Sequence, residues 1–144
     1  MLFVTVFAGI LDLETGMLNY CNAGHENPYL LHPEDVVLRR IEDGDGPPLC
    51  VAAEFVYLGG HYRMRPGELL CVISDGVTEA QNLQGDFYGR PRLEEIIKLR
   101  GDAATARGVV EALRTDVEAF VAGADPADDF TILVLRWHGP QAAG

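Results

Sequence analysis

The chain has 144 residues, of which 48% are hydrophobic and 23% charged, which suits one soluble domain with an apolar core. Its 22 acidic and 11 basic residues give a net charge of -11, so nucleic acid is an unfavourable partner. The longest apolar stretch, residues 2–11, is about half as long as a membrane-spanning helix. No basic residue precedes this stretch, so we expect a cytoplasmic protein without membrane contact.

The first half of the chain is typical of β-structure. Residues 2–12 and 17–23 are apolar runs joined by the turn Glu14-Thr15-Gly16, which predicts a hairpin. Further apolar segments between clusters of Pro and Gly predict strands at 29–32, 36–40, 55–58 and 68–74.

The second half has helical periodicity. Pro91 suits the first turn of a helix that Gly101 can end. Apolar residues then recur every three or four positions over residues 109–121, which predicts a second helix with Gly123 as its C-terminal cap. The apolar run 130–137 predicts a buried strand. We therefore expect an α+β fold in which helices cover a mostly antiparallel sheet.

Several classes of active site are missing from the sequence. Cys21, Cys50 and Cys71 form no paired motif, and we expect them to be buried free thiols. None of them has the arginine six residues later that a cysteine phosphatase needs. Ser74 lacks the glycine two residues before it that a hydrolase elbow requires, and no phosphate-binding glycine directly precedes Lys98.

Two acidic segments stand at strand ends. Asp75, followed by Gly76, comes directly after the 68–74 strand, and Asp128-Asp129 directly precedes the last strand. If these strands are antiparallel neighbours, the carboxylates meet at one sheet edge and repel each other unless a cation lies between them. Ligation by oxygen alone suits Mg²⁺ or Mn²⁺. In the alternative, Asp75 caps a turn and the later aspartates are solvated.

Six segments occur in an order that resembles a known family. They are Asn22-Ala23-Gly24-His25 with Pro28, Gly46-x-Pro48-Leu49, Pro66-Gly67-Glu68, residues 74–80 (SDGVTEA), Phe87-Tyr88-Gly89, and Asp128-Asp129-Phe130-Thr131. Over residues 1–137 this set resembles the bacterial sporulation and stress-response branch of the PP2C-like (PPM) serine/threonine phosphatases. The resemblance implies an α-β-β-α sandwich of two mainly antiparallel sheets flanked by helices. It also implies a two-metal Mn²⁺ or Mg²⁺ centre whose bridging hydroxide attacks phosphoserine or phosphothreonine.

The resemblance also assigns roles to single residues. Asp75 and Asp128 match the family's catalytic, metal-ligating aspartates, with Asp128 preferred to Asp129 as a ligand. Gly76 allows close packing and is a candidate backbone ligand. Four further residues have supporting positions: Asn22, His25, Glu79 and Thr131.

Two of these supporting roles stay open. Asn22 and His25 either build a loop near the site or contact phosphate or water directly. Glu79 either accepts a hydrogen bond from metal-bound water or is a helix-start carboxylate favoured by the helix dipole. Thr131 is expected to support the turn that carries the late aspartates.

The departures from the family pattern concern completeness. Cys50 stands where the family usually has glycine, and the family's first acidic motif and its metal-bridging Asp-Gly lie upstream of the position matched by Met1. We therefore expect residues 1–138 to be the C-terminal portion of an N-terminally truncated phosphatase domain, with residues 139–144 as a frayed tail. Such a piece should self-associate through exposed sheet edges, bind metal weakly and show little or no turnover.

The expected function is that of a metal-dependent phosphatase module acting on a phosphorylated regulator of the anti-anti-sigma factor type. The alternative is a non-catalytic interaction domain derived from the same fold. A calcium loop at residues 43–46 (DGDG) is a third interpretation, but the glutamate that an EF-hand needs is missing downstream, and an acidic turn is sufficient.

Overall fold

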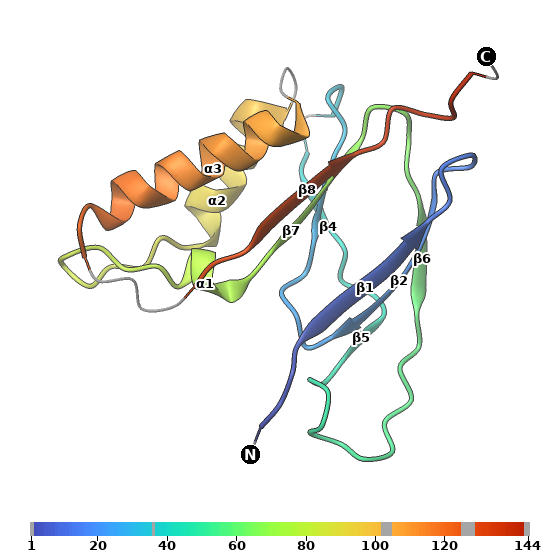
Figure 1. Cartoon of the computed structure of the whole chain (residues 1–144), viewed down its shortest axis with the longest axis horizontal. Helices are drawn as coiled ribbons and strands as arrows, with labels where there is room; N and C mark the ends of the chain where they lie inside the picture. The colour runs from blue at the N-terminus through green and yellow to red at the C-terminus, as the bar shows by residue number, and fades with distance from the viewer. Residues whose placement is uncertain (1, 36, 102–104, 125–128, 143–144) are drawn as a thin grey trace.

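The computed structural model describes residues 2–35, 37–101, 105–124 and 129–142, which form two four-stranded sheets and one layer of helices (Figure 1). In the first sheet, β2 (Met17–Ala23) pairs with β1 (Val6–Leu11), β5 (Asp45–Gly46) and β6 (Gly60–Arg63). The second sheet has the order β4 (Arg39–Arg40), β3 (Tyr29–Leu31), β7 (Leu69–Ile73), β8 (Ile132–Arg136). The helices are α1 (Asp75–Thr78), α2 (Arg90–Gly101) and α3 (Ala106–Val121).

Each face of the second sheet contributes residues to an apolar core, which explains why its strands β7 and β8 are largely apolar. On β7, Leu69, Cys71 and Ile73 pack in the core beneath the helices, whereas Leu70 and Val72 pack in the core between the two sheets. Burial raises the pKa of the Cys71 thiol to about 12, so this cysteine stays a protonated core residue. The predicted two-sheet sandwich is confirmed. Among the described residues, its long helices α2 and α3 lie on the outer face of the second sheet (Figure 1).

Helix α3 follows its sequence pattern closely. Val109, Leu113 and Val117 share one buried face, as expected for a spacing of four residues. The Thr105 hydroxyl caps the first turn by accepting a hydrogen bond from the Gly108 amide at 3.1 Å. At the other end the chain turns left-handed at Ala122, one residue before the predicted cap.

The strand predicted at 55–58 is wrong, because that segment forms no strand and β6 lies further on. The rings of Phe55 and Tyr57 instead pack edge to face, 4.8 Å between centroids, and occupy the space beside Gly46. β6 begins at Gly60, where a side chain would meet the Tyr20 ring. A glycine is therefore needed where β6 meets β2. Of the strand predicted at 36–40, the structure forms β4 at its end, and residue 36 lies outside the described residues.

The three cysteines differ in burial. Cys71 is buried and Cys21 is partly buried, but Cys50 is exposed, so the prediction of a buried thiol is wrong at this position. Cys50 also has a φ of 69°, a left-handed conformation that disfavours any residue with a Cβ atom.

Replacing Cys50 by glycine is expected to raise the free energy of unfolding by about 1 kcal/mol, because glycine adopts the left-handed backbone without steric cost. Urea denaturation monitored by circular dichroism measures the change. Cys50→Ala is the matched control, since it removes the thiol but keeps the Cβ atom and should gain nothing. An equal gain in both variants would assign the effect to the thiol and refute the backbone explanation.

Candidate functional site

The two strands that carry the acidic segments are antiparallel neighbours, which is the condition under which their ends meet at one sheet edge. Ile73 at the end of β7 lies opposite Ile132 at the start of β8. Beyond this pair, the Ser74 amide donates to the Thr131 carbonyl at 3.0 Å, and the Thr131 amide donates to Ser74 Oγ at 2.8 Å. The segment after β7 is thus joined by two hydrogen bonds to the segment before β8.

Gly76 lets the two segments approach each other. A Cβ atom at this position would collide with the carbonyl oxygen of Asp129, which is a backbone atom and cannot rotate away. Gly76 is buried, and the neighbouring Asp75 is exposed at the first position of α1. The close contact therefore places Asp75 at the same sheet edge as the backbone of Asp129.

Among the described residues, the Asp75 carboxylate makes no capping hydrogen bond to the backbone. Ser74 is the N-terminal cap of α1 and makes no side-chain capping bond, and it is the Asp75 carbonyl that accepts hydrogen bonds from Thr78 Oγ1 and the Glu79 amide. The alternative in which the Asp75 side chain caps a turn therefore has no support in this geometry.

The described residues do not by themselves complete a metal centre. Within residues 2–35, 37–101, 105–124 and 129–142, no three His, Cys, Asp or Glu side chains gather closely enough to hold an ion. Asp128 lies outside the described residues, and Asp129 is exposed beside Gly76. The donors that the described residues place at this edge are carboxylate oxygens, the ligand type that Mg²⁺ and Mn²⁺ prefer, but these alone are too few to hold an ion.

The supporting residues occupy two places. Asn22 is buried, and its amide donates to the His25 carbonyl at 2.9 Å and to Asn27 Oδ1 at 3.1 Å, while its oxygen accepts from the His25 amide at 2.8 Å. These bonds build the loop that follows β2. Glu79 is exposed and ends α1, so the interpretation as a helix-start carboxylate is wrong.

The segment Phe87-Tyr88-Gly89 is bonded to the end of α1 and the residues after it. The Tyr88 amide donates to the Ala80 carbonyl at 2.7 Å, and the Gly89 amide donates to the Thr78 carbonyl at 2.9 Å. The segment Phe87-Tyr88-Gly89 is therefore bonded directly to the helix that begins with Asp75.

The comparisons with known proteins agree with this architecture. The family model described as "Stage II sporulation protein E (SpoIIE)" matches residues 1–138. The chain belongs to the SpoIIE family.

Two curated relatives of this SpoIIE-family chain are longer proteins. Protein IcfG of Synechocystis sp. is 29% identical over 134 residues, which are 93% of this chain and 20% of that protein. The phosphoserine phosphatase RsbU of Bacillus subtilis is 27% identical over 135 residues, which are 94% of this chain and 39% of that protein. The chain thus spans well under half the length of either relative.

Solved structures share the fold. The phosphatase domain of SpoIIE from Bacillus subtilis superposes with a TM-score of 0.67 at 15% identity, covering 96% of this chain and 60% of that one. The RsbU and RsbW domains of Rv1364c from Mycobacterium tuberculosis give a TM-score of 0.69 at 24% identity, covering 96% and 37%. The SiaA PP2C domain of Pseudomonas aeruginosa gives 0.68 at 18% identity, covering 84% and 46%. The sandwich is therefore of the PP2C type. No helix among its described residues is both long and apolar enough to cross a bilayer.

A cluster that supports the site was missed in the sequence. Asp116 of α3 accepts hydrogen bonds from Tyr88 Oη at 2.6 Å, Arg92 Nε at 2.8 Å and Arg92 Nη2 at 3.0 Å. The Arg92 guanidinium also lies over the rings of Tyr88 and Phe120. This cluster anchors the segment bonded to α1. The sequence indicated only the motif Phe87-Tyr88-Gly89. No pattern in the sequence connected this motif to Asp116.

Replacing Asp116 by asparagine is expected to lower the free energy of unfolding at pH 7 by about 1–2 kcal/mol. The hydrogen bond from Arg92, followed by that from Tyr88, holds the pKa of Asp116 below its usual value. Because the folded pKa lies below the unfolded one, the stabilisation is complete above about pH 4 and is lost as the pH falls through the folded pKa.

Urea denaturation of both proteins at neutral and acidic pH tests this expectation. The difference between them should shrink as the pH falls below about 4. Glu118→Gln, which alters a surface ion pair at 4.0 Å on the same helix, should change the free energy by less than about 0.5 kcal/mol. A difference for Asp116→Asn that is constant with pH would refute a contribution from the ionised carboxylate.

Proposed function

We propose that this chain is the C-terminal portion of a metal-dependent protein phosphatase domain that hydrolyses phosphoserine or phosphothreonine. The observation that carries the proposal is the exposed Asp75, held at one sheet edge beside the Asp129 backbone by the contact at Gly76. Membership of the SpoIIE family and the likeness to a phosphoserine phosphatase, RsbU, support the reaction type.

Asp75 and Asp128 are the proposed ligands of Mn²⁺ or Mg²⁺, with Asp129 as the weaker candidate. A bound divalent cation would neutralise phosphate charge and lower the pKa of a coordinated water. The chain's own task is to hold the ligands in place, and the hydrogen bonds between Ser74 and Thr131 do this for the two acidic segments. Gly76 brings the backbones together, and Glu79 is an exposed acceptor at the end of the same helix.

The shortage of ligands among the described residues bears on activity. Because the chain covers 60% of the SpoIIE phosphatase domain, we propose that further metal ligands come from the part of such a domain that these residues do not span. On this view the 144-residue chain alone binds metal weakly and has little or no turnover. The same shortage favours a second candidate function, a non-catalytic domain that binds a regulatory protein.

The proposed substrate is a cytoplasmic regulator of the anti-anti-sigma factor type carrying one phosphorylated serine or threonine. Support comes from the likeness to RsbU and to a protein in which an RsbU domain and an RsbW domain share one chain. The net charge of -11 gives no reason to expect a nucleic-acid partner, because such partners are bound mainly through basic side chains.

The test uses a hybrid protein in which residues 1–138 replace the matched segment of Bacillus subtilis RsbU, so that the rest of the domain is supplied. Phosphate release from a phosphoserine protein is measured with and without Mn²⁺. We expect Mn²⁺-dependent hydrolysis that falls by at least about 100-fold in Asp75→Asn, a typical loss when a group that stabilises the transition state is removed.

Glu95→Gln is the matched control, because it removes an exposed carboxylate on α2 away from the sheet edge. A folded hybrid whose activity is the same with Asp75→Asn would refute the assigned role of Asp75. A folded hybrid without any activity, as judged by a cooperative thermal transition, would favour the non-catalytic candidate.

A further inference from the structure

Arg90 stands close to the helix that begins with Asp75. It is the first residue of α2 and directly follows Gly89, whose amide donates to the Thr78 carbonyl of α1 at 2.9 Å. α1 is a single turn of four residues, about 6 Å long, with Asp75 at its start. Arg90 is therefore held beside the far end of the helix that carries the proposed metal ligand.

The loop after β2 meets Arg90 from a second direction. Arg90 Nη2 lies 3.9 Å from Glu26 Oε2. The loop of Glu26 leads into β3, whose first residue, Tyr29, lies opposite Cys71 of β7. In the second sheet, β3 lies on the side of β7 that is opposite to β8. Glu26 and Arg90 thus meet near the end of β7, on the side that faces away from the β8 edge.

Stability does not explain an arginine at this position. A separation of 3.9 Å is longer than a hydrogen bond, and the side chains of Arg90 and Glu26 are 48% and 37% exposed, so their ion pair contributes little. The N-terminus of a helix also disfavours a cation, because the helix dipole places partial positive charge there. Arg92, in the same turn, is compensated by two hydrogen bonds to Asp116, whereas Arg90 makes no comparable bond within the described residues. Its guanidinium is therefore available to a ligand.

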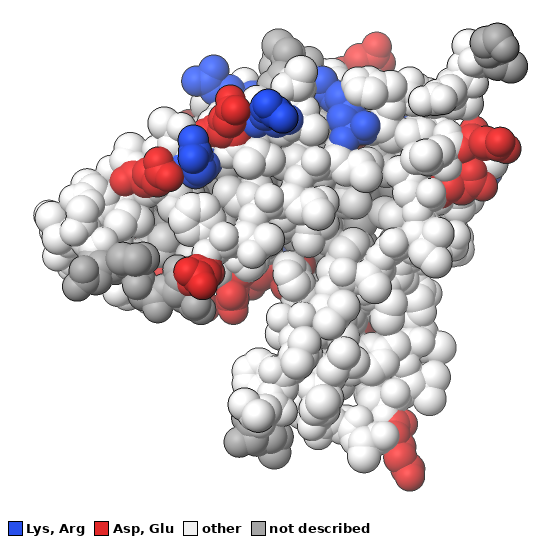
Figure 2. All heavy atoms as spheres, in the orientation of Figure 1, with Lys and Arg blue, Asp and Glu red and all other residues white. Residues whose placement is uncertain are grey.

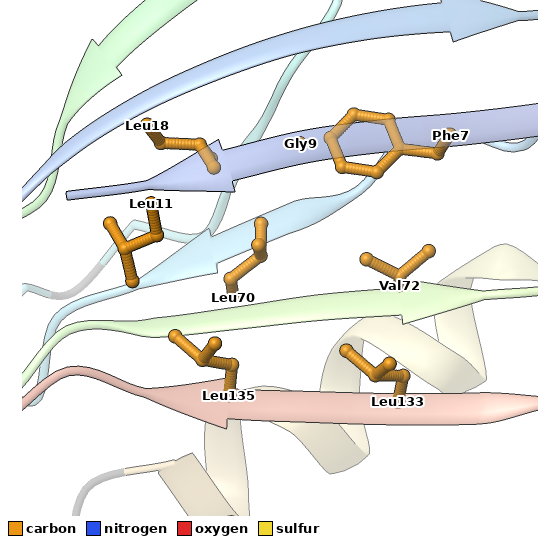
Figure 3. A pocket seen from close by; sticks show the side chains of 8 residues that line it. All are labelled: Phe7, Gly9, Leu11, Leu18, Leu70, Val72, Leu133 and Leu135. Atoms are coloured by element: carbon orange, nitrogen blue, oxygen red, sulfur yellow. The ribbon is translucent and has the colours of Figure 1, made fainter. Parts of the chain in front are cut away.

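The surroundings of the site are otherwise acidic or apolar. Figure 2 shows acidic side chains where α1 lies, while the basic side chains of this face gather mostly over the long helices. The groove of about 270 Å³ between the two sheets is lined by apolar side chains such as Leu70 and Leu133, so it offers no charge (Figure 3). Because a phosphoprotein brings negative charge to a chain with a net charge of -11, a cation beside the site favours its binding.

We infer that Arg90 binds an acidic side chain next to the phosphorylated residue of the substrate, and so selects phosphoproteins with a carboxylate at that place. The inference rests on the proposed phosphatase function and adds a feature of its substrate. The planar guanidinium matches the two oxygens of a carboxylate. The length of α1 separates Arg90 from Asp75, which favours a neighbouring side chain over the phosphoryl group itself. Glu26 competes with the substrate carboxylate for the same guanidinium.

The test compares two synthetic phosphoserine peptides as substrates of the hybrid of residues 1–138 with RsbU. One peptide carries glutamate on both sides of the phosphoserine, and the other carries glutamine there. We expect a lower KM for the acidic peptide. Arg90→Gln should raise this KM by about threefold, a typical effect of an exposed ion pair, with no change in kcat or in the KM of the glutamine peptide. Glu26→Gln should lower the KM of the acidic peptide, because it removes the competing carboxylate.

Arg114→Gln is the matched control, because it makes the same change in net charge at an exposed arginine of α3 whose ion pair is 4.0 Å long. Arg90→Lys keeps the charge and should retain part of the preference. Equal KM values of the parent hybrid for the two peptides, or a preference that Arg90→Gln leaves intact, would overturn the inference. So would an equal loss in Arg114→Gln. A matching loss with p-nitrophenyl phosphate, which has no flanking side chain, would also overturn it and indicate a contact with the phosphoryl group.

A binding measurement separates this inference from the proposed function. A folded hybrid without hydrolysis contradicts the proposed function, and the fluorescence anisotropy of the two labelled peptides in the presence of Mn²⁺ then measures their affinities directly. Tighter binding of the acidic peptide that is lost in Arg90→Gln supports the inference in that case as well. Equal affinities, or no binding of either peptide, would overturn it.

Discussion

Replacing Leu113 by alanine is expected to lower the free energy of unfolding by about 2–5 kcal/mol, the range for deleting a large buried aliphatic side chain. Leu113 has no exposed surface and lies on the face of α3 that packs in the core between the helices and the second sheet. The change removes apolar contacts and leaves a cavity beneath both long helices. Because a domain of this size is commonly stable by only about 5–15 kcal/mol, the loss would be a large part of the total.

Urea denaturation of the purified variant measures this loss. Leu83→Ala is the matched control, since Leu83 is 69% exposed and its truncation should change the free energy by less than about 0.5 kcal/mol. Similar changes in both variants would contradict the packing of α3 on the second sheet.

Replacing Gly76 by alanine is expected to lower the free energy of unfolding by about 1–3 kcal/mol and to separate the two acidic segments. The added Cβ atom would collide with the Asp129 carbonyl, and relief requires the backbone at the sheet edge to move. Metal binding should weaken together with stability, because the ligands on the two segments no longer meet.

Gly9→Ala is the control for this substitution. Its Cβ atom would meet the flexible end of the Leu18 side chain at 3.1 Å, which can adjust at little cost. Thermal unfolding followed by circular dichroism compares the two variants. If Gly76→Ala is no less stable than Gly9→Ala, the close approach of α1 to Asp129 is not a constraint on the site.

Much of the fold could be predicted, because a strand or helix that buries one face in a core has a clear periodicity of apolar residues. The hairpin β1–β2 and the helix α3 are examples. The segment 55–58 was misassigned since its aromatic residues have high strand propensity, but they pack on Gly46 rather than on a neighbouring strand. α1 is a single turn and too short for a periodic signal.

The site was predictable only in part, because some of its contacts join residues that are far apart in the sequence. Asp75 could be placed from its position at the end of a strand. The β7–β8 pairing could be stated only as a condition, because the sequence does not say which strands are neighbours. The bonds from Tyr88 and Arg92 to Asp116 could not be predicted, because they join positions 28 and 24 apart in sequence and no motif links these residues. The left-handed backbone at Cys50 had one indication in the sequence comparison: the resembled family usually has glycine at this position.

Calorimetric titration with Mn²⁺ tests the central claim most directly, because it reports on the ligands at the β7–β8 edge without requiring turnover. The parent chain and Glu95→Gln are expected to bind Mn²⁺ with the same affinity, and Asp75→Asn and Asp128→Asn to bind at least about tenfold more weakly, since each loses a charged oxygen ligand. An affinity unchanged by both aspartate substitutions would contradict the assignment of this edge as the metal site.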